Sequence, residues 1–385
     1  MQRRLYEQDH EDFRAIVREY VEREVVPHQE RWDAERMVER GAWLAAGRQG
    51  VLGLSVPEEY GGGGVTDVRY RSVVIEELAR VGAAAVNLGF GLQDDIFLPY
   101  LLSLATLEQR ERWLPGVAGG ELIGAIAMTE PGAGSDLQGI RSTAVRRGEE
   151  WILNGTKTFI TNGIAADLVI VVARTDPDAG SRGLSLFMVE RGMPGFGRGR
   201  KLDKIGLVAQ DTAELVFEDV RVPAGNLLGK EGGGFAHLME NLSSERLSIA
   251  LQALYPARTV LGWTLEYTKE RTAFGRPLAA FQNTQFRLAD MVTELDVVQA
   301  YVDDCLRALN AGELTAVDAA KAKLAATELQ QRVVDRCLQL FGGYGYMSEY
   351  PVSRSFLDAR VQTIYGGTSE IMRTIIGRDV TGVRS

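Results

Sequence analysis

The sequence predicts an α+β protein in which a helical segment, a β-rich segment and a second helical segment follow one another. Apolar residues recur with a helical period up to about Trp113, with a period close to two from about Leu122, and with a helical period again beyond Gly234. A chain of 385 residues is long enough for two or three packed domains. We therefore expect an N-terminal α-helical domain over 1–121, a middle β-barrel or β-sandwich domain over 122–232, and a C-terminal four-helix bundle over 233–385.

The N-terminal part opens with an amphipathic pattern. Apolar side chains follow one face of a helix at Phe13, Ile16, Val17, Tyr20 and Val21. Pro27 should end this helix, because proline lacks the amide N–H that a helix interior uses. More helical pattern runs from Arg71 to about Trp113, and the glycine run 61–64 is the interruption.

The middle part carries strand and turn signals. Asn154-Gly155 is the residue pair that a type I′ hairpin turn prefers, and it lies between 151–153 and 156–161, which read as two strands. The apolar run 168–172 predicts a buried strand. In the segment 212–222 apolar and acidic residues alternate, which is typical of a half-buried strand.

The C-terminal part reads as about four long helical segments. Their short connections suit an antiparallel bundle.

Composition excludes several classes of function. The 43 basic and 52 acidic residues give a net charge of −9, which disfavours nucleic acid as a partner, because that binding depends on clustered cations. The longest apolar stretch is far shorter than the ~20 residues of a membrane span. The start of the chain is acidic and lacks the apolar core of a signal peptide, so we expect a cytoplasmic protein.

Metal and thiol chemistry are also disfavoured. The only cysteines are Cys305 and Cys337, and the three histidines are scattered along the chain. We expect no metal site. Any chemistry should therefore use carboxylates, hydroxyls, backbone amides or a bound cofactor.

The most informative motif is the segment Met128-Thr129-Glu130-Pro131-Gly132-Ala133-Gly134-Ser135-Asp136. Small residues allow backbone N–H groups to approach an anionic or heteroaromatic ligand, and Thr129 and Ser135 add hydroxyl groups. A glycine-rich turn that leads into a strand is the alternative interpretation.

From end to end, the chain resembles the acyl-CoA dehydrogenase family. The resemblance is carried by several segments in the family's order and spacing: LSVPEEYGG (54–62), MTEPGAGSD (128–136), TFITNG (158–163), RTAFG (271–275), QLFGG (339–343) and YGGTSEI (365–371). Together these motifs are far more specific than a single glycine-rich loop.

The resemblance implies FAD as cofactor. Its contacts within one chain are implied to be Met128, Thr129, Gly134, Ser135, Phe159, Ile160, Thr161, Thr368, Ser369 and Glu370. Phe159 replaces the tryptophan of many members and keeps an aromatic plane. Residues implied to reach the FAD of a neighbouring subunit are Arg271, Phe274, Gln282, Gln339, Gly342 and Gly343. The resemblance thus implies at least a dimer, and commonly a homotetramer.

The family's reaction forms a double bond between Cα and Cβ of an acyl thioester. Many members carry the catalytic glutamate at the position of Gly366, which cannot act as a base. In isovaleryl-CoA and long-chain types the carboxylate comes from a Glu-Arg-Leu segment, and Glu245-Arg246-Leu247 matches it. The resemblance therefore implies Glu245 as base and Gly366 with Gly367 as backbone donors to the thioester oxygen. Glu370 is the rival carboxylate, although the resemblance places it among the cofactor contacts.

Substrate contacts are implied for Ser135, Arg246, Gly366 and Gly367. The segments 206–215 and 358–368 are most similar to the long-chain type. This resemblance implies a long-chain or branched acyl-CoA as substrate and an electron-transferring flavoprotein as electron acceptor. Two alternatives remain: the same chemistry on a thioester of an acyl-carrier protein, and a non-catalytic flavin-binding or assembly protein.

Overall fold

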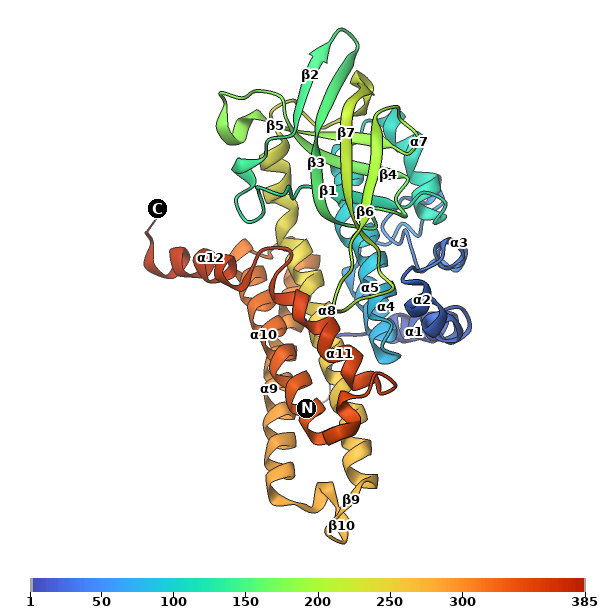
Figure 1. Ribbon diagram of the computed structural model, residues 1–385, viewed down its shortest axis with the longest axis vertical. Helices are drawn as coiled ribbons and strands as arrows, with labels where there is room; N and C mark the ends of the chain where they lie inside the picture. The colour runs from blue at the N-terminus through green and yellow to red at the C-terminus, as the bar shows by residue number, and fades with distance from the viewer. Residues whose placement is uncertain (1–2, 384–385) are drawn as a thin grey trace.

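The computed structural model describes residues 3–383, in which a helical part, a β-rich part and a second helical part follow in the expected order (Figure 1). The β-rich part lies at one end of the molecule, and the longest helices run from it to the opposite end (Figure 1). The predicted α+β class is confirmed.

The N-terminal part contains seven α-helices among the described residues: α1 (Gln8–Tyr20), α2 (Gln29–Glu35), α3 (Arg40–Arg48), α4 (Val68–Arg80), α5 (Ala84–Gly91), α6 (Leu98–Leu104) and α7 (Leu107–Ala118). A π-helical turn, Leu92–Phe97, joins α5 directly to α6. This turn carries Asp94 and Asp95 into the interior of the molecule.

The prediction that Pro27 ends the first helix was wrong. α1 ends at Tyr20, and the chain continues through a π turn (Val21–Val25) into the 3₁₀ turn Val26–His28, which contains Pro27. Pro27 occupies the first turn of this element, where a missing N–H leaves no hydrogen bond unmade.

The middle part is an eight-stranded sheet. Its strands are β1 (Gly124–Ala127), β2 (Thr143–Arg147), β3 (Glu150–Thr161), β4 (Leu168–Arg174), β5 (Leu184–Glu190), β6 (Phe196–Lys201), β7 (Thr212–Pro223) and β8 (Leu227–Leu228). The order is β6-β7-β3-β2-β4-β5-β8, and β1 pairs in parallel with β4. The predicted strands 168–172 and 212–222 lie in β4 and β7 and are therefore confirmed.

The predicted hairpin turn at Asn154-Gly155 was wrong, because both residues lie inside β3. The pairing of β3 with β7 shifts register between Leu153 and Gly155, so the pair forms a bulge. Asn154 bonds to Asp219 on β7 through its side chain. A Cβ on Gly155 would lie 2.1 Å from Ser142 Oγ, so only glycine fits there.

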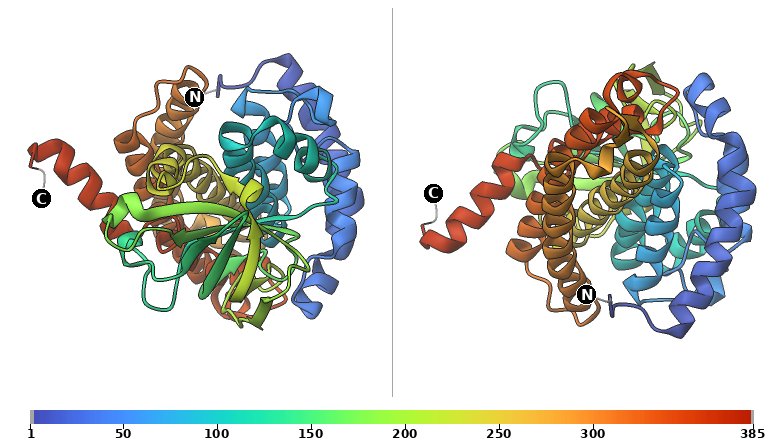
Figure 2. Two further views of the ribbon diagram at one scale, coloured as in Figure 1. Left: turned by 90° about the horizontal axis from the view of Figure 1, so that it is seen from above. Right: turned by 90° about the horizontal axis from the view of Figure 1, so that it is seen from below.

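The C-terminal part has three long helices, α8 (Gly234–Glu270), α9 (Gln282–Asn310) and α10 (Ala316–Phe341). The fourth expected segment is divided into α11 (Pro351–Ala359) and α12 (Ser369–Thr381), and both pack on α10. A small hairpin of β9 (Thr272–Ala273) and β10 (Arg276–Pro277) joins α8 to α9. Figure 2 shows the N-terminal helices along one side of these long helices. No helix within residues 3–383 is long and apolar enough to cross a lipid bilayer.

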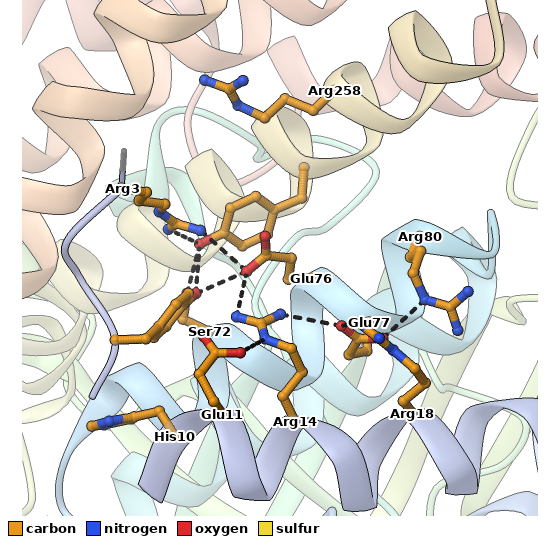
Figure 3. Close-up of polar contacts among 12 residues, drawn as sticks. Arg3, His10, Glu11, Arg14, Arg18, Ser72, Glu76, Glu77, Arg80 and Arg258 are labelled. Carbon is orange, nitrogen blue, oxygen red and sulfur yellow. Dashed lines mark hydrogen bonds and ion pairs between the residues drawn. The ribbon is translucent and has the colours of Figure 1, made fainter. Parts of the chain in front are cut away.

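A network of hydrogen bonds and ion pairs connects the start of the chain to the long helices (Figure 3). The Arg3 guanidinium donates to Tyr255 Oη on α8 at 2.7 Å and to both carboxylate oxygens of Asp303 on α9. Arg3 also pairs with Glu76 on α4. Ser72, one turn earlier on α4, lies 2.7 Å from Tyr255 Oη. The N-terminal and C-terminal helical parts therefore share one interior.

Candidate active site

Glu245 begins the continuously buried stretch of α8. The following residues, 246–255, are all buried, since this stretch of α8 packs between α4 on one side and α9 and α10 on the other. Glu245 itself is 3% exposed. Tyr100 Oη on α6 donates a hydrogen bond to Glu245 Oε1 at 2.9 Å. Burial disfavours the charged carboxylate and raises the pKa of Glu245 to about 7, although Tyr100 and Arg246 oppose the shift.

A two-glycine turn faces the same stretch of α8. Gly366 and Gly367 have φ values of +63° and +95°, a region that favours glycine. A Cβ on Gly366 would lie 2.3 Å from Cδ1 of Ile249, which is one helical turn beyond Glu245. The turn and the buried carboxylate therefore lie on one side of α8.

Two cations flank this turn. Lys323 on α10 is 1% exposed, and its Nζ donates to the carbonyl oxygen of Gly367 at 2.6 Å. Burial, together with the charge of Arg246, lowers the pKa of Lys323 to about 8. Arg246 is also buried, its Nε has no hydrogen-bond partner in the described part of the chain, and burial lowers its pKa. The site thus presents positive charge around the backbone of Gly366 and Gly367.

The loop after β1, which contains Met128, Thr129, Gly134 and Ser135, is held from one side. The buried carboxylate of Glu130 accepts hydrogen bonds from the backbone N–H groups of Arg141 and Ser142, and from Lys157 Nζ at 2.9 Å. Lys157 also donates to the carbonyl of Met128 at 3.0 Å.

The remaining part of this loop is open. Gly134 and Ser135 are exposed, and a Cβ on Gly134 would meet nothing within 4 Å. The loop is thus rigid at its base and accessible at its tip.

Phe159 on β3 stands beside this loop, because Thr158 N donates to the carbonyl of Thr129 at 2.9 Å. Its ring is 67% exposed and its φ is +60°, which is unusual for an aromatic residue. Ile160 is buried and Thr161 is half-buried. An exposed aromatic ring beside a glycine-containing loop fits a flat heteroaromatic group with polar substituents, such as FAD.

A second group of predicted cofactor residues lies far from this loop. They are all exposed and lie at the end of the helical part remote from the sheet (Figure 1): Arg271, Phe274, Gln282, Gln339, Gly342 and Gly343. The Arg271 guanidinium lies 5.4 Å from the ring centroid of Tyr344, which links the β9–β10 hairpin to the end of α10. Phe274 is 97% exposed. Within one chain, the group that contains Arg271 and Phe274 therefore lies apart from the loop after β1 and from Phe159.

The last predicted contacts begin α12. Thr368 caps this helix by accepting a hydrogen bond from Ile371 N, Ser369 is buried, and Glu370 is exposed. Hydrogen bonds at the helix start lower the pKa of Glu370. An exposed carboxylate with a lowered pKa is poorly suited to abstract a proton, in contrast to Glu245.

Sequence reasoning missed the contacts that surround Glu245. Tyr100 lies 145 positions earlier in the chain, and no local pattern connects the two residues. Lys323 occupies the buried face of an ordinary amphipathic helix. Only the folded structure brings these side chains to the site.

Comparison with known families identifies the chain. Three family descriptions match it in sequence order: "Acyl-CoA dehydrogenase, N-terminal domain" over 7–121, "middle domain" over 125–220, and "C-terminal domain" over 232–381. The chain therefore belongs to the acyl-CoA dehydrogenase family. The boundaries at 121/122 and 232/233 stay predictions.

Individual relatives agree with this assignment. The chain is 48% identical to the mouse (Mus musculus) mitochondrial long-chain specific acyl-CoA dehydrogenase, covering 98% of this chain and 88% of that protein. It is 37% identical to mitochondrial isovaleryl-CoA dehydrogenase of Solanum tuberosum, covering 98% and 91%. The predicted family and subgroup are confirmed.

Solved structures give the same result. An acyl-CoA dehydrogenase from Geobacillus kaustophilus has a TM-score of 0.96 at 48% identity, covering 98% of this chain and 100% of that one. A glutaryl-CoA dehydrogenase from Mycobacterium smegmatis in complex with FADH2 has a TM-score of 0.92 at 32% identity, covering 99% and 96%.

Proposed function

We propose that this protein is an FAD-dependent acyl-CoA dehydrogenase that forms the α,β double bond of a long-chain or branched acyl-CoA, with Glu245 as base. The observation that carries the proposal is the buried Glu245 carboxylate, which lies on the same side of α8 as the Gly366-Gly367 turn. The long-chain and isovaleryl-CoA names of the two relatives support this substrate class.

Glu245 removes the α-proton of the thioester. Its pKa of about 7 suits it to accept a proton near neutral pH. The α-proton is weakly acidic, so negative charge that develops on the thioester oxygen needs preorganised donors. Backbone N–H groups of the Gly366-Gly367 turn supply such donors, and the cations Lys323 and Arg246 add favourable potential. FAD, when bound, supplies the acceptor for the β-hydride.

The cofactor is held by residues of two chains in this proposal. Met128, Thr129, Gly134 and Ser135, with Phe159 to Thr161, form the contacts of one chain, and the group around Arg271 and Phe274 comes from a second copy. The start of α12, at Thr368, Ser369 and Glu370, completes the set, and Ser135 and Arg246 also contact substrate. The relative that binds FADH2 supports the cofactor assignment. We propose a homotetramer built as a dimer of dimers.

The electrons leave to an electron-transferring flavoprotein in this proposal, and the enzyme acts in the cytoplasm. The experiment is an anaerobic titration of the FAD-loaded protein with acyl-CoA esters of different chain length and branching. Bleaching of the flavin absorbance by long or branched esters is the expected result. Bleaching only by acyl-carrier-protein thioesters would support the biosynthetic alternative, and no bleaching by any thioester would support a non-catalytic role.

A further inference from the structure

A buried lysine lies at the base of the loop after β1. Lys157 on β3 is 0% exposed, and its Nζ atom donates to Glu130 Oε1 at 2.9 Å and to the carbonyl oxygen of Met128 at 3.0 Å. The Glu130 side chain is buried as well. A buried ion pair contributes little net stability, because the loss of hydration offsets the attraction between the charges. Stability alone is therefore a weak explanation for a buried lysine at this position.

Glu130 ties the two ends of the loop together. Its backbone N–H donates to the carbonyl of Ala133 at 2.9 Å, and Ala133 N donates back to the carbonyl of Glu130 at 3.1 Å. Its carboxylate accepts from Arg141 N and Ser142 N, which lie directly before β2. The chain thus leaves Glu130 and returns to it. The ion pair with Lys157 consequently connects both ends of the loop to β3.

The same lysine lies at an irregularity in β3. The pairing of β3 with β7 shifts register between Lys157 and Ile160, so the strand is bulged there. In this bulge Thr158 N donates to the carbonyl of Thr129, and Phe159 takes a φ of +60°. A non-glycine residue at such a φ is strained by about 1 to 3 kcal/mol and persists only where its surroundings fix it. The bonds from the bulge to the loop are part of those surroundings.

The peptide between Met128 and Thr129 is left with one free donor. This peptide is trans, so its N–H points away from its C=O group, which accepts from Lys157. The Thr129 N–H has no hydrogen-bond partner in the described part of the chain. A backbone N–H in a half-buried residue needs an acceptor, which water or a ligand can provide.

Lys157 carries a positive charge near neutral pH. Burial lowers the pKa of Lys157 to about 8, and Glu130 opposes this shift, so most of the side chains remain protonated at pH 7. Hydrogen bonds from a charged donor are roughly twice as strong as those between neutral groups. The bond from Lys157 therefore polarises the Met128 carbonyl, which makes the Thr129 N–H of the same peptide a stronger donor.

We infer that Lys157 is a positioning residue for the cofactor: together with Glu130 it holds the segment 128–130 and the Phe159 ring in the arrangement that receives the flavin, and its charge favours the reduced flavin. The inference rests on the proposed function, because it concerns the FAD of the same site. A hydride carries one negative charge, so a cation near the flavin stabilises the reduced form more than the oxidised form. Glu130, as an anion, acts in the opposite direction.

The test uses FAD and needs no acyl-CoA. Titration of the apoprotein with FAD, followed by flavin fluorescence, gives the Kd of the cofactor. Reductive titration of the FAD-loaded protein against reference dyes gives the midpoint potential of the bound flavin. Lys157→Met should raise the Kd by about tenfold or more, which is the effect of losing one charge-assisted hydrogen bond. The midpoint potential should fall, because the variant lacks the cation.

The sign of the potential shift separates a charge effect from a loosened loop. Glu130→Gln removes the anion and keeps an oxygen that can accept from Lys157. Its midpoint potential should therefore rise, and its Kd should increase less than in Lys157→Met. Lys157→Arg keeps a cation and a donor and should recover part of the affinity and of the potential. Lys230→Met, at an exposed lysine after β8, is the matched control and should behave as the parent.

A second comparison covers the case in which Lys157→Met does not fold because Glu130 is left without its partner. The double change Lys157→Met with Glu130→Gln leaves neither charge of the pair. Compared with Glu130→Gln alone, the double variant should bind FAD more weakly and have a lower midpoint potential.

The outcomes separate this inference from the function on which it rests. Unchanged potentials in Lys157→Met and Glu130→Gln, or shifts of the same sign in both, would overturn the inference and leave the dehydrogenase function standing. If no thioester bleaches the flavin of the parent, the proposed function fails, while the Kd and the potential still decide the role of Lys157. A parent protein that binds no FAD would overturn both.

Discussion

Lys323 Nζ and the carbonyl oxygen of Gly367 are joined by a 2.6 Å hydrogen bond, although Lys323 is 1% exposed and has a cation, Arg246, as neighbour. Burying an ammonium group costs desolvation free energy. The hydrogen bond from Lys323 to Gly367 therefore holds the turn in place in spite of this cost. We infer that Lys323 is a positioning residue, which holds the backbone N–H groups of the turn where the thioester oxygen needs them.

Lys323→Met should therefore slow proton abstraction by about 10²-fold, the effect of a misplacement of about 1 Å. KM should change much less, since Lys323 does not bind the substrate. Lys323→Arg, which keeps a donor, should recover part of the rate. Single-turnover flavin reduction measures each rate, and Lys321→Met on the exposed face of the same helix is the control. Equal losses in Lys323→Met and Lys323→Arg would contradict a hydrogen-bond role.

Glu245→Gln should slow flavin reduction by about 10² to 10⁴-fold or more while substrate still binds, because the amide keeps the shape of the side chain and cannot accept the proton. Glu240→Gln, at an exposed position on α8, is the matched control and should react at the parental rate. Glu370→Gln should weaken FAD retention with a smaller effect on the reduction step. A parental reduction rate in Glu245→Gln would falsify the assignment of the base.

The pH profile should depend on Tyr100. Burial raises the pKa of Glu245 to about 7, and the Tyr100 hydrogen bond opposes that rise by stabilising the carboxylate. The base acts when deprotonated, so kcat/KM should increase as pH rises through about 7. Tyr100→Phe removes the opposing bond, and the profile should move to higher pH. A profile that moves to lower pH, or stays in place, would show that Tyr100 does not stabilise the carboxylate.

FAD retention should depend on assembly. Arg271→Ala removes a cation from the exposed group at the β9–β10 hairpin, so this variant should lose FAD on dilution more readily than the parent. Absorbance of gel-filtered samples over a range of protein concentrations measures the loss. Lys269→Ala, an exposed cation that pairs with Glu266 on the last turn of α8, is the control. Equal retention in Arg271→Ala and the parent at every concentration would exclude a cofactor contact across subunits.

A relocated carboxylate should restore part of the activity. Glu245→Gly with Gly366→Glu returns a carboxylate from the turn to the same side of α8. A side chain at 366 meets Ile249 Cδ1 at 2.3 Å and takes a φ of +63°, so Ile249→Ala should improve the recovery. Flavin reduction compares the double and triple variants with Glu245→Gly alone. No gain in either variant would show that position 366 does not reach the α-carbon.

The sequence correctly predicted those elements whose residue pattern is compatible with only one kind of structure. The continuous apolar run 168–172 can be satisfied only in the interior, and it became the buried strand β4. Asn154-Gly155 has two meanings, since a turn and a bulge both need a residue without Cβ, and the contact with Ser142 that decides between them comes from another strand.

The candidate site was accessible to sequence reasoning only in part. The resemblance to the family suggested Glu245 and the turn at Gly366. The residues that set the surroundings, Tyr100 and Lys323, come from two different helices and look like ordinary helix residues in the sequence. Their roles depend on long-range packing, which no local period encodes.

The length of α8 limits which insertions and deletions the sequence can tolerate. The helix carries Glu245 in its buried part and ends at Glu270, directly before the hairpin with Arg271 and Phe274. Each residue of an α-helix adds about 100° of rotation and 1.5 Å of rise. One inserted or deleted residue between Glu245 and Arg271 would turn the hairpin by about a quarter of a circle relative to the carboxylate. Substitutions in this stretch are therefore far easier to accommodate than any change in its length, because only a change in length alters the direction of the hairpin relative to the buried carboxylate.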